Sequence, residues 1–295
     1  MPHEIKVPTP KTFNYKRTVA SHGWRGLKPF FFDESKWELT RVIDLGSKLP
    51  ITVTVTGDDG ALTIRTPTKL SRTDTAKVTR DITHVFRLDD DLDAFYGVTG
   101  AHPEFSWIGK QGAGRLLRSP TVFEDLVKTI CTTNCSWALT KKMVSGLVDN
   151  LGRETKDGLR SFPSAEAMAR MPLRFYVEEV RAGYRAPYLK ELADRVASGE
   201  LPVESWCQTT ASTTELVKEI KQVKGAGTYA AENLLKLLGR YDGLALDSWT
   251  RARFYELRNK GRKAKDKKIE AYYAPFKEWR GLALWCDVTR DWLEE

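Results

Sequence analysis

The sequence is poor in cysteine and histidine, and neither residue type is grouped as a metal site requires. Structural zinc and iron–sulfur sites need thiolates at short, repeated spacings, and no CxxC pair is present. His22, His84 and His102 have no metal-ligand spacing, and we assign them no catalytic role. We therefore expect reduced thiols and no metal bound by side chains. The cysteines are Cys131, Cys135, Cys207 and Cys286.

Long apolar runs are also missing. The N-terminal segment MPHEIKVPTPKTF lacks the apolar stretch of a signal peptide, and no later segment is long enough to span a membrane. We therefore expect an intracellular protein without a membrane partner.

Acidic residues are too few to balance the basic ones. The chain has 47 Lys and Arg residues against 39 Asp and Glu residues, a formal net charge of +8. Basic side chains neutralise phosphates and release counterions, so this excess suits a polyanionic partner. Many basic proteins bind no nucleic acid, and charge alone leaves both possibilities open.

The front of the chain has the alternation of β-strands. Ile51, Val53 and Val55 alternate with threonines, and a GDDG turn leads to a second alternation through Leu62 and Ile64. This pattern predicts a hairpin with one buried face. An aromatic stretch upstream suits core packing for most of its members, although a pocket wall is the alternative; it contains Trp24, Phe30, Phe31, Phe32 and Trp37.

Helical spacing dominates from about residue 79. The stretch from Asp81 to Tyr96 looks helical, and apolar faces recur over 122–130, 139–151 and 188–196. We therefore predict an α+β protein with a β-rich N-terminal domain over residues 1–78. A mainly α-helical domain is expected over residues 79–295.

A helical hairpin is predicted after Ser212. Ser212 and Glu215 have the spacing of a capping box, and the helix they start ends at VKGAG. Gly225 and Gly227 allow positive φ and close backbone approach, and a second helix begins at Thr228. The free amides of that helix start can hold a DNA phosphate without reading sequence. Hairpins of this kind also occur with no binding role.

A carboxylate follows this hairpin directly after an apolar run. In GLALDSW, Asp247 stands where packing alone would not favour a charge. One interpretation is an N-cap for the helix that starts near Ser248. The other is a catalytic carboxylate facing a cleft, and the two roles are compatible.

These residues resemble the helix-hairpin-helix (HhH-GPD) superfamily of DNA glycosylases, between its 3-methyladenine and 8-oxoguanine branches. The helix-hairpin-helix and aspartate signature is matched by IKQVKGAGTYAAENLLKLLGRYDGLALDSWTRARF. The helix, wedge turn and helix of both branches are matched by RSPTVFEDLVKTICTTNCSWALTKKMVSGLVDNLG. FPSAEAMARM and AGYRAPYLKELA resemble the 8-oxoguanine branch. The resemblance is strong over residues 115–254 and weak before residue 80.

The resemblance implies base removal in base excision repair, with Asp247 at the catalytic position. A fixed carboxylate stabilises the positive charge that develops on the sugar and orients the attacking water. Tyr229 stands where bifunctional members carry a lysine, and Lys224 is not at the matching position. A phenol cannot form a Schiff base, so we expect a monofunctional enzyme without lyase activity. Tyr229 either stacks on the flipped base or packs in the core.

Other matched positions imply DNA contacts. Asn134 matches the residue that fills the gap left by the flipped nucleotide, although a turn-forming asparagine would also explain it. Tyr184 and Arg185 match residues that wedge the duplex and contact the orphan base. Leu139 replaces a second arginine of the 8-oxoguanine branch, which argues against that specificity. The hairpin residues Gly225, Gly227 and Thr228 are expected to bind the backbone.

The resemblance leaves the base open. Trp285 lies on a helix that resembles the wall of the family's base pocket, as does Trp279. We expect an alkylated purine, with an oxidised or deaminated purine such as 8-oxoguanine or hypoxanthine as the alternative. A lesion-binding protein with little catalysis is a third possibility.

No cofactor is expected to be required, although the hairpin could bind a monovalent cation. The expected partner is damaged double-stranded DNA, bound by a monomer in the cytoplasm and nucleoid of a prokaryote or the nucleus of a eukaryote.

Overall fold

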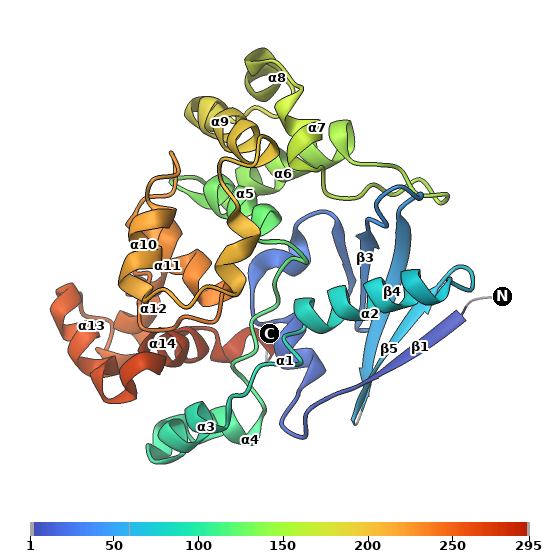
Figure 1. Cartoon of the computed structure of the whole chain (residues 1–295). Coiled ribbons are helices and arrows are strands. Elements are labelled where there is room, and N and C mark those ends of the chain that lie inside the picture. The colour runs from blue at the N-terminus through green and yellow to red at the C-terminus, as the bar shows by residue number, and fades with distance from the viewer. Residues whose placement is uncertain (1–2, 59, 294–295) are drawn as a thin grey trace.

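The computed structural model describes residues 3–58 and 60–293. Near its N-terminus the chain forms one five-stranded antiparallel sheet in the order β1-β5-β4-β3-β2. The sheet lies at one side of the molecule with the helix of residues 72–85 across it, and most of the other helices gather at the other side (Figure 1). The strands are β1 (His3–Pro8), β2 (Phe30–Asp33), β3 (Glu38–Ile43), β4 (Ile51–Asp58) and β5 (Ala61–Thr66).

The predicted hairpin is present as β4 and β5. Val55 pairs with Ile64, and both side chains are almost completely buried, so the apolar members of the alternation share one face. The turn between the strands includes residue 59, which lies outside the described residues.

The rest of the chain is mainly helical, which confirms the α+β class. The helices are α1 (Tyr15–Val19), α2 (Arg72–Val85), α3 (Asp93–Gly100), α4 (Trp107–Lys110), α5 (Val122–Thr132), α6 (Trp137–Leu151), α7 (Ala165–Ala169), α8 (Leu173–Glu178), α9 (Ala186–Ala197), α10 (Thr213–Ile220), α11 (Thr228–Leu237), α12 (Ser248–Arg258), α13 (Asp266–Tyr273) and α14 (Arg280–Val288). Among the described residues, no helix is both long and apolar enough to cross a membrane.

The expectation of one helix from Asp81 to Tyr96 is wrong. α2 starts earlier, at Arg72, and ends at Val85, and α3 begins only at Asp93. Arg87 has φ of 56°, which a right-handed helix cannot accommodate. The run of three aspartates after Leu88 is typical of a turn and marks this break in the sequence.

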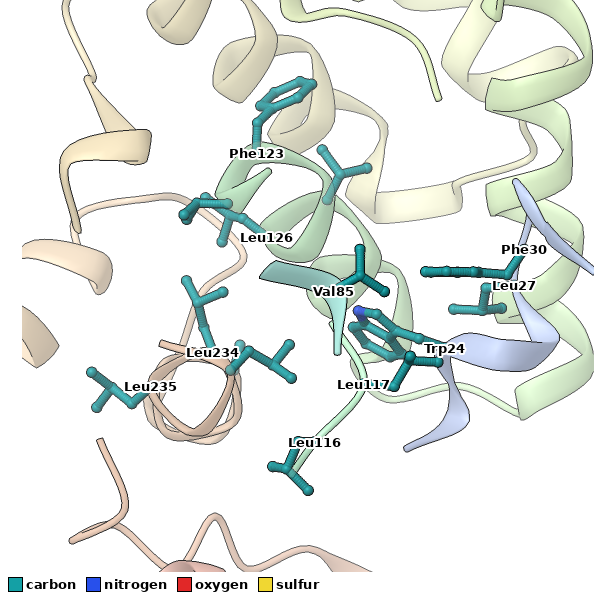
Figure 2. Packing of buried hydrophobic residues seen from close by; sticks show 14 of the residues in the cluster. Trp24, Leu27, Phe30, Val85, Leu116, Leu117, Phe123, Leu126, Leu234 and Leu235 are labelled. Carbon is teal, nitrogen blue, oxygen red and sulfur yellow. The ribbon is translucent and has the colours of Figure 1, made fainter. Parts of the chain in front are cut away.

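The core joins the two parts of the chain. Phe123 and Leu126 of α5 and Leu234 of α11 lie in the same packed cluster as Trp24 and Phe30 from the N-terminal part (Figure 2). α2 also crosses the predicted boundary at residue 78. The division at that residue stays a prediction.

The C-terminal part of the chain returns to the N-terminal part. Trp285 on α14 donates a hydrogen bond from Nε1 to the carbonyl oxygen of Ser21, at 2.8 Å. Arg17 on α1 donates to the carbonyl oxygen of Arg290 at 2.7 Å. In Figure 1 the C-terminal end of α14 accordingly runs toward α1. This closure brings Ser21 and Trp285 next to each other, close to α11.

Candidate active site

Asp247 caps the N-terminus of α12. Its Oδ1 accepts hydrogen bonds from Thr250 N at 2.7 Å and from Thr250 Oγ1 at 2.9 Å. Thr250 Oγ1 in turn accepts from the backbone N–H of Asp247 at 2.8 Å, which completes a capping box. The capping interpretation of Asp247 is therefore confirmed. The hydrogen bonds of this cap use Oδ1 and leave Oδ2 for another partner.

Oδ2 of Asp247 is held from α11. The hydroxyl of Tyr229 donates a hydrogen bond to it at 3.2 Å. Burial and the negative charge of Asp247 raise the pKa of the Tyr229 phenol above its usual value, so the phenol keeps its proton and remains a donor. Asp247 is thus fixed from both sides, by α12 and by α11.

The loop before Asp247 is also held by α11. Ala245 has φ of 52°, a left-handed conformation that is unfavourable for alanine. Its N–H donates to Oε2 of Glu232 at 2.6 Å, which holds this backbone in place. Glu232 therefore acts as a positioning residue for the segment that carries Asp247.

Asp247 and Tyr229 line a cavity of about 840 Å³ that is bounded by α5, α6, α11, α12, α14 and the N-terminal part of the chain. Tryptophans make up much of the wall. Gly23 allows Trp137 to approach closely, since a Cβ at Gly23 would lie 2.7 Å from Cη2 of that ring. Flat aromatic walls suit a planar ligand. The aromatic residues at this cavity are His22, Trp24, Trp137, Tyr229, Trp249, Trp285 and Trp292.

The structure therefore brings Asp247, Tyr229 and Trp285 together, as the sequence predicted. Trp279 does not join them: its ring stacks on Tyr241 with centroids 5.4 Å apart and is not among the cavity residues. Sequence reasoning did not identify Trp249, although it stands only two residues after Asp247. It also gave no role to His22 at this wall, because only the tertiary closure brings His22 there.

Two buried ionisable groups lie at or beside this wall, since His22 lines the cavity and Lys236 contacts the ring of Trp285. Lys236 is 2% exposed, and burial lowers its pKa to about 8, while the carboxylates of Asp247 and Glu232 oppose this shift. Burial, with the positive charges of Lys236 and Lys128, lowers the pKa of His22 to about 3. The imidazole is therefore neutral near pH 7, whereas the lysine is mostly charged.

The predicted wedge turn lies between α5 and α6. Asn134 is exposed at its tip with φ of 45°, which asparagine tolerates better than most residues. Arg185 is 3% exposed and donates to the carbonyl oxygen of Thr133, so it holds the turn from its buried side. Tyr184 is 52% exposed beside it, with the Arg185 guanidinium 4.4 Å from its ring centre. Of the three, Asn134 and Tyr184 are presented on the surface.

The hairpin joins α10 to α11, and its capping box at Ser212 and Glu215 is confirmed. Gly225 has φ of 89°, as predicted, but Gly227 does not use positive φ: it is the N-cap of α11 with φ of −65°. No side chain caps the first turn that begins at Thr228. The first backbone N–H groups of α11 can therefore donate to an acceptor from outside the helix.

No protein-family model matches the sequence. Solved DNA glycosylases have the same fold. MBOgg1 in complex with a low-affinity DNA ligand superposes with a TM-score of 0.77 and 23% identity, covering 99% of this chain and 96% of that one. The 3-methyladenine DNA glycosylase of Archaeoglobus fulgidus gives a TM-score of 0.77 at 17% identity, covering 98% of both chains. For the 8-oxoguanine glycosylase/lyase of Clostridium acetobutylicum the TM-score is 0.76 at 20% identity, with 97% and 95% covered.

One curated sequence is also similar. The N-glycosylase/DNA lyase of Saccharomyces cerevisiae is 28% identical over 131 residues, which is 42% of this chain. The match spans 34% of the yeast protein. Together with the structural comparisons, it establishes that the chain has the fold of helix-hairpin-helix DNA glycosylases of both the 8-oxoguanine and 3-methyladenine types.

Proposed function

We propose that this protein is a DNA glycosylase that hydrolyses the N-glycosidic bond of a damaged purine flipped into the cavity. The observation that carries the proposal is the carboxylate of Asp247, held by Thr250 and Tyr229 at the wall of an aromatic cavity of about 840 Å³. A cavity with stacking surfaces and one oriented charge is what removal of a planar base requires.

Asp247 performs two tasks in the proposed reaction. Cleavage of the N-glycosidic bond leaves positive charge on the sugar, and a preorganised carboxylate stabilises that charge. The same carboxylate orients the attacking water and accepts its proton as the new C–O bond forms. Thr250 and Tyr229 contribute by keeping both oxygens of Asp247 in place.

The proposal includes base removal without strand cleavage. A lyase needs an amine that attacks the sugar, and Tyr229 offers a phenol at the position next to Asp247. Two lysines lie near the cavity: Nζ of Lys236 is buried, and Lys141 lines the cavity from α6, with its Nζ beside Gly26. Borohydride reduction during turnover tests this part, since it traps a Schiff base as a covalent protein–DNA adduct.

Two classes of base are candidates for the cavity. The aromatic walls favour a cationic alkylated purine, which is already a good leaving group and needs only stacking and one carboxylate. The similarity to solved 8-oxoguanine glycosylases favours a neutral oxidised purine instead. A deaminated purine such as hypoxanthine belongs to the second class, because it too is neutral and carries a carbonyl oxygen.

Damaged double-stranded DNA is the proposed partner of a monomeric protein. The uncapped first turn of α11, with Gly225, Gly227 and Thr228, is proposed to bind a backbone phosphate. Asn134 and Tyr184 are proposed to enter the duplex where the base has left, with Arg185 supporting the turn. Flipping a nucleotide costs roughly a few kcal/mol, which such contacts offset.

We also propose that the hairpin binds a monovalent cation weakly. Its turn offers main-chain carbonyl oxygens, and no cluster of three or more metal-binding side chains is found among the described residues. Backbone carbonyl oxygens can coordinate a monovalent cation without a charged side chain. No step of the reaction depends on it, and we propose that the reaction itself needs no cofactor.

Free-base release tests the proposal. Duplexes that carry one N7-methylguanine, 8-oxoguanine or hypoxanthine are incubated with excess protein, and the released base is quantified by mass spectrometry. We expect release of at least one of these bases and an abasic strand that stays intact until alkali is added. Binding to the duplexes without release of any base would instead support a lesion-binding protein.

A further inference from the structure

Two buried nitrogen atoms beside the cavity lack hydrogen-bond partners. Nζ of Lys236 and Nδ1 of His22 are both shielded from solvent, and neither has a partner within the part of the chain that the structure describes. Lysines usually extend their ammonium groups to water, so a lysine whose Nζ stays inside is unusual. An ammonium group offers three donors and is costly to bury without an acceptor.

Both atoms flank the same tryptophan. Nζ of Lys236 lies 4.6 Å from the ring centre of Trp285, and the His22 ring centre lies 5.6 Å from that ring. His22 and Trp285 both line the cavity, and Lys236 lies next to Trp285 without itself being a lining residue. Trp285 also receives support from Ser21, to which its Nε1 donates. The contact with the ring offsets part of the cost of burying the ammonium but supplies no acceptor.

The helix places Lys236 on the side that carries Tyr229. Lys236 lies two turns after Tyr229 on α11 and therefore on the same side of the helix. Long helical side chains lean toward the N-terminus of their helix, which here is the end that carries Tyr229. The carboxylates of Asp247 and Glu232 both act on Lys236, and both raise its pKa against the effect of burial. The ammonium is thus near Asp247 without being neutralised by it.

We propose that Lys236, with His22, forms a polar subsite that binds the carbonyl oxygen of a neutral oxidised or deaminated purine. The inference rests on the proposed function and selects between its two classes of base. A carbonyl oxygen supplies the acceptor that the buried ammonium lacks. A cationic alkylated purine would instead place a second positive charge beside Lys236 in a medium of low dielectric constant. Lys236 is therefore a specificity-determining residue, and it selects against alkylated purines.

Single-turnover excision tests the subsite on duplexes with hypoxanthine, 8-oxoguanine or N7-methylguanine. Lys236→Met keeps the apolar stem and removes the charge, and His22→Phe keeps the ring and removes Nδ1. For Lys236→Met we expect loss of at least about tenfold in the rate on the neutral base that the protein excises, as for a lost hydrogen bond to a charged group. The rate on N7-methylguanine should stay unchanged or rise. His22→Phe should shift the ratio in the same direction by less.

A matched control separates the subsite from general effects of charge. Lys48→Met removes a lysine whose side chain is 56% exposed in an ion pair with Asp74, and it should change none of the three rates. Thermal melting checks that each variant is folded. An equal loss on all three duplexes in Lys236→Met, or no loss on any, would overturn the subsite.

Equilibrium binding gives a readout that does not require turnover. In an Asp247→Asn background, Lys236→Met should weaken binding of the hypoxanthine and 8-oxoguanine duplexes but not of the N7-methylguanine duplex. If the binding ratio does not change, the subsite is wrong even where bases are released. If the protein with Asp247 intact releases no base, the proposed glycosylase is wrong, while the binding ratio still decides the subsite.

Discussion

The hydroxyl of Tyr229 donates a hydrogen bond to Oδ2 of Asp247, at 3.2 Å. The other oxygen of the same carboxylate, Oδ1, accepts two hydrogen bonds from Thr250. The carboxylate is therefore oriented by a tyrosine at a position where a lysine would act as a nucleophile. This single contact links the two parts of the proposed chemistry, which are hydrolysis by Asp247 and the lack of a Schiff base.

Replacing Tyr229 by lysine should create the lyase activity that we propose the protein lacks. The Nζ of Tyr229→Lys would lie beside Asp247, where the abasic sugar must be. We expect borohydride to trap a protein–DNA adduct with this variant and none with the unchanged protein. Denaturing gels of the reduced reaction measure the adduct directly.

Tyr229→Phe is the control, because it removes the hydroxyl and adds no amine. An efficient adduct with the unchanged protein would refute the monofunctional proposal. Lys236→Met would then show whether the buried amine of Lys236 had formed it, since the adduct would disappear in that variant.

Serine at the two hairpin glycines should separate folding from DNA binding. Gly225 has φ of 89°, and a Cβ there would lie 2.9 Å from Cδ2 of Tyr188, so Gly225→Ser should lower the free energy of unfolding by roughly 1–3 kcal/mol. Gly227 has open space around it and is the N-cap of α11. Serine is a favoured N-cap, so Gly227→Ser should keep the stability or raise it.

The same Gly227→Ser variant should bind DNA less well. Its hydroxyl would accept from the first-turn amides that are proposed to hold a phosphate, and the two acceptors would compete. Chemical denaturation and fluorescence anisotropy with a duplex measure the two properties. Unchanged affinity in Gly227→Ser would show that the hairpin amides do not contact the backbone.

Removing the buried charge of Lys236 should stabilise the protein. Burial lowers the pKa of Lys236 from 10.5 to about 8, which corresponds to roughly 3 kcal/mol at neutral pH. Between pH 8 and 10.5 the unfolded chain holds a proton that the folded protein has lost, so this cost diminishes as the pH rises. Lys236→Met should therefore be the more stable protein at pH 7, by an amount that shrinks toward pH 10.

Denaturant unfolding of both proteins at several pH values measures this difference. Because other groups titrate in both proteins alike, only the difference between them is informative. A Lys236→Met variant that is less stable at pH 7 would show that Lys236 has a stabilising partner. Its charge would then not be available to a base.

Local features of this molecule were predictable from the sequence. The capping box of Ser212 and Glu215 and the N-cap at Asp247 depend on residues three apart, and such spacings are visible in a sequence. The buried face of Ile51, Val53 and Val55 follows from the two-residue period of a strand.

The cavity wall was less predictable, because the chain closure forms it. His22 and Trp285 are 5.6 Å apart at their ring centres but lie more than 260 residues apart in the sequence. The burial of Lys236 had a local signal in the sequence. The lysine interrupts the apolar run LLKLL, so leucines flank it on both sides. The break at Arg87 was missed because the helical period continues across it, and only the aspartates that follow indicate the turn.

Comparison of Asp247→Asn with the unchanged protein tests the proposed mechanism most directly. Asparagine caps helices as well as aspartate does, so the variant should fold and bind the lesion duplex with unchanged affinity. Free-base release under single-turnover conditions, measured by mass spectrometry, should fall by at least about 100-fold, because the carboxylate that stabilises the sugar charge and orients the water is lost. Asp149→Asn, which alters a surface ion pair with Lys28, should release the base at the unchanged rate. Release by Asp247→Asn at a rate close to that of the unchanged protein would contradict the role of Asp247 and the mechanism built on it.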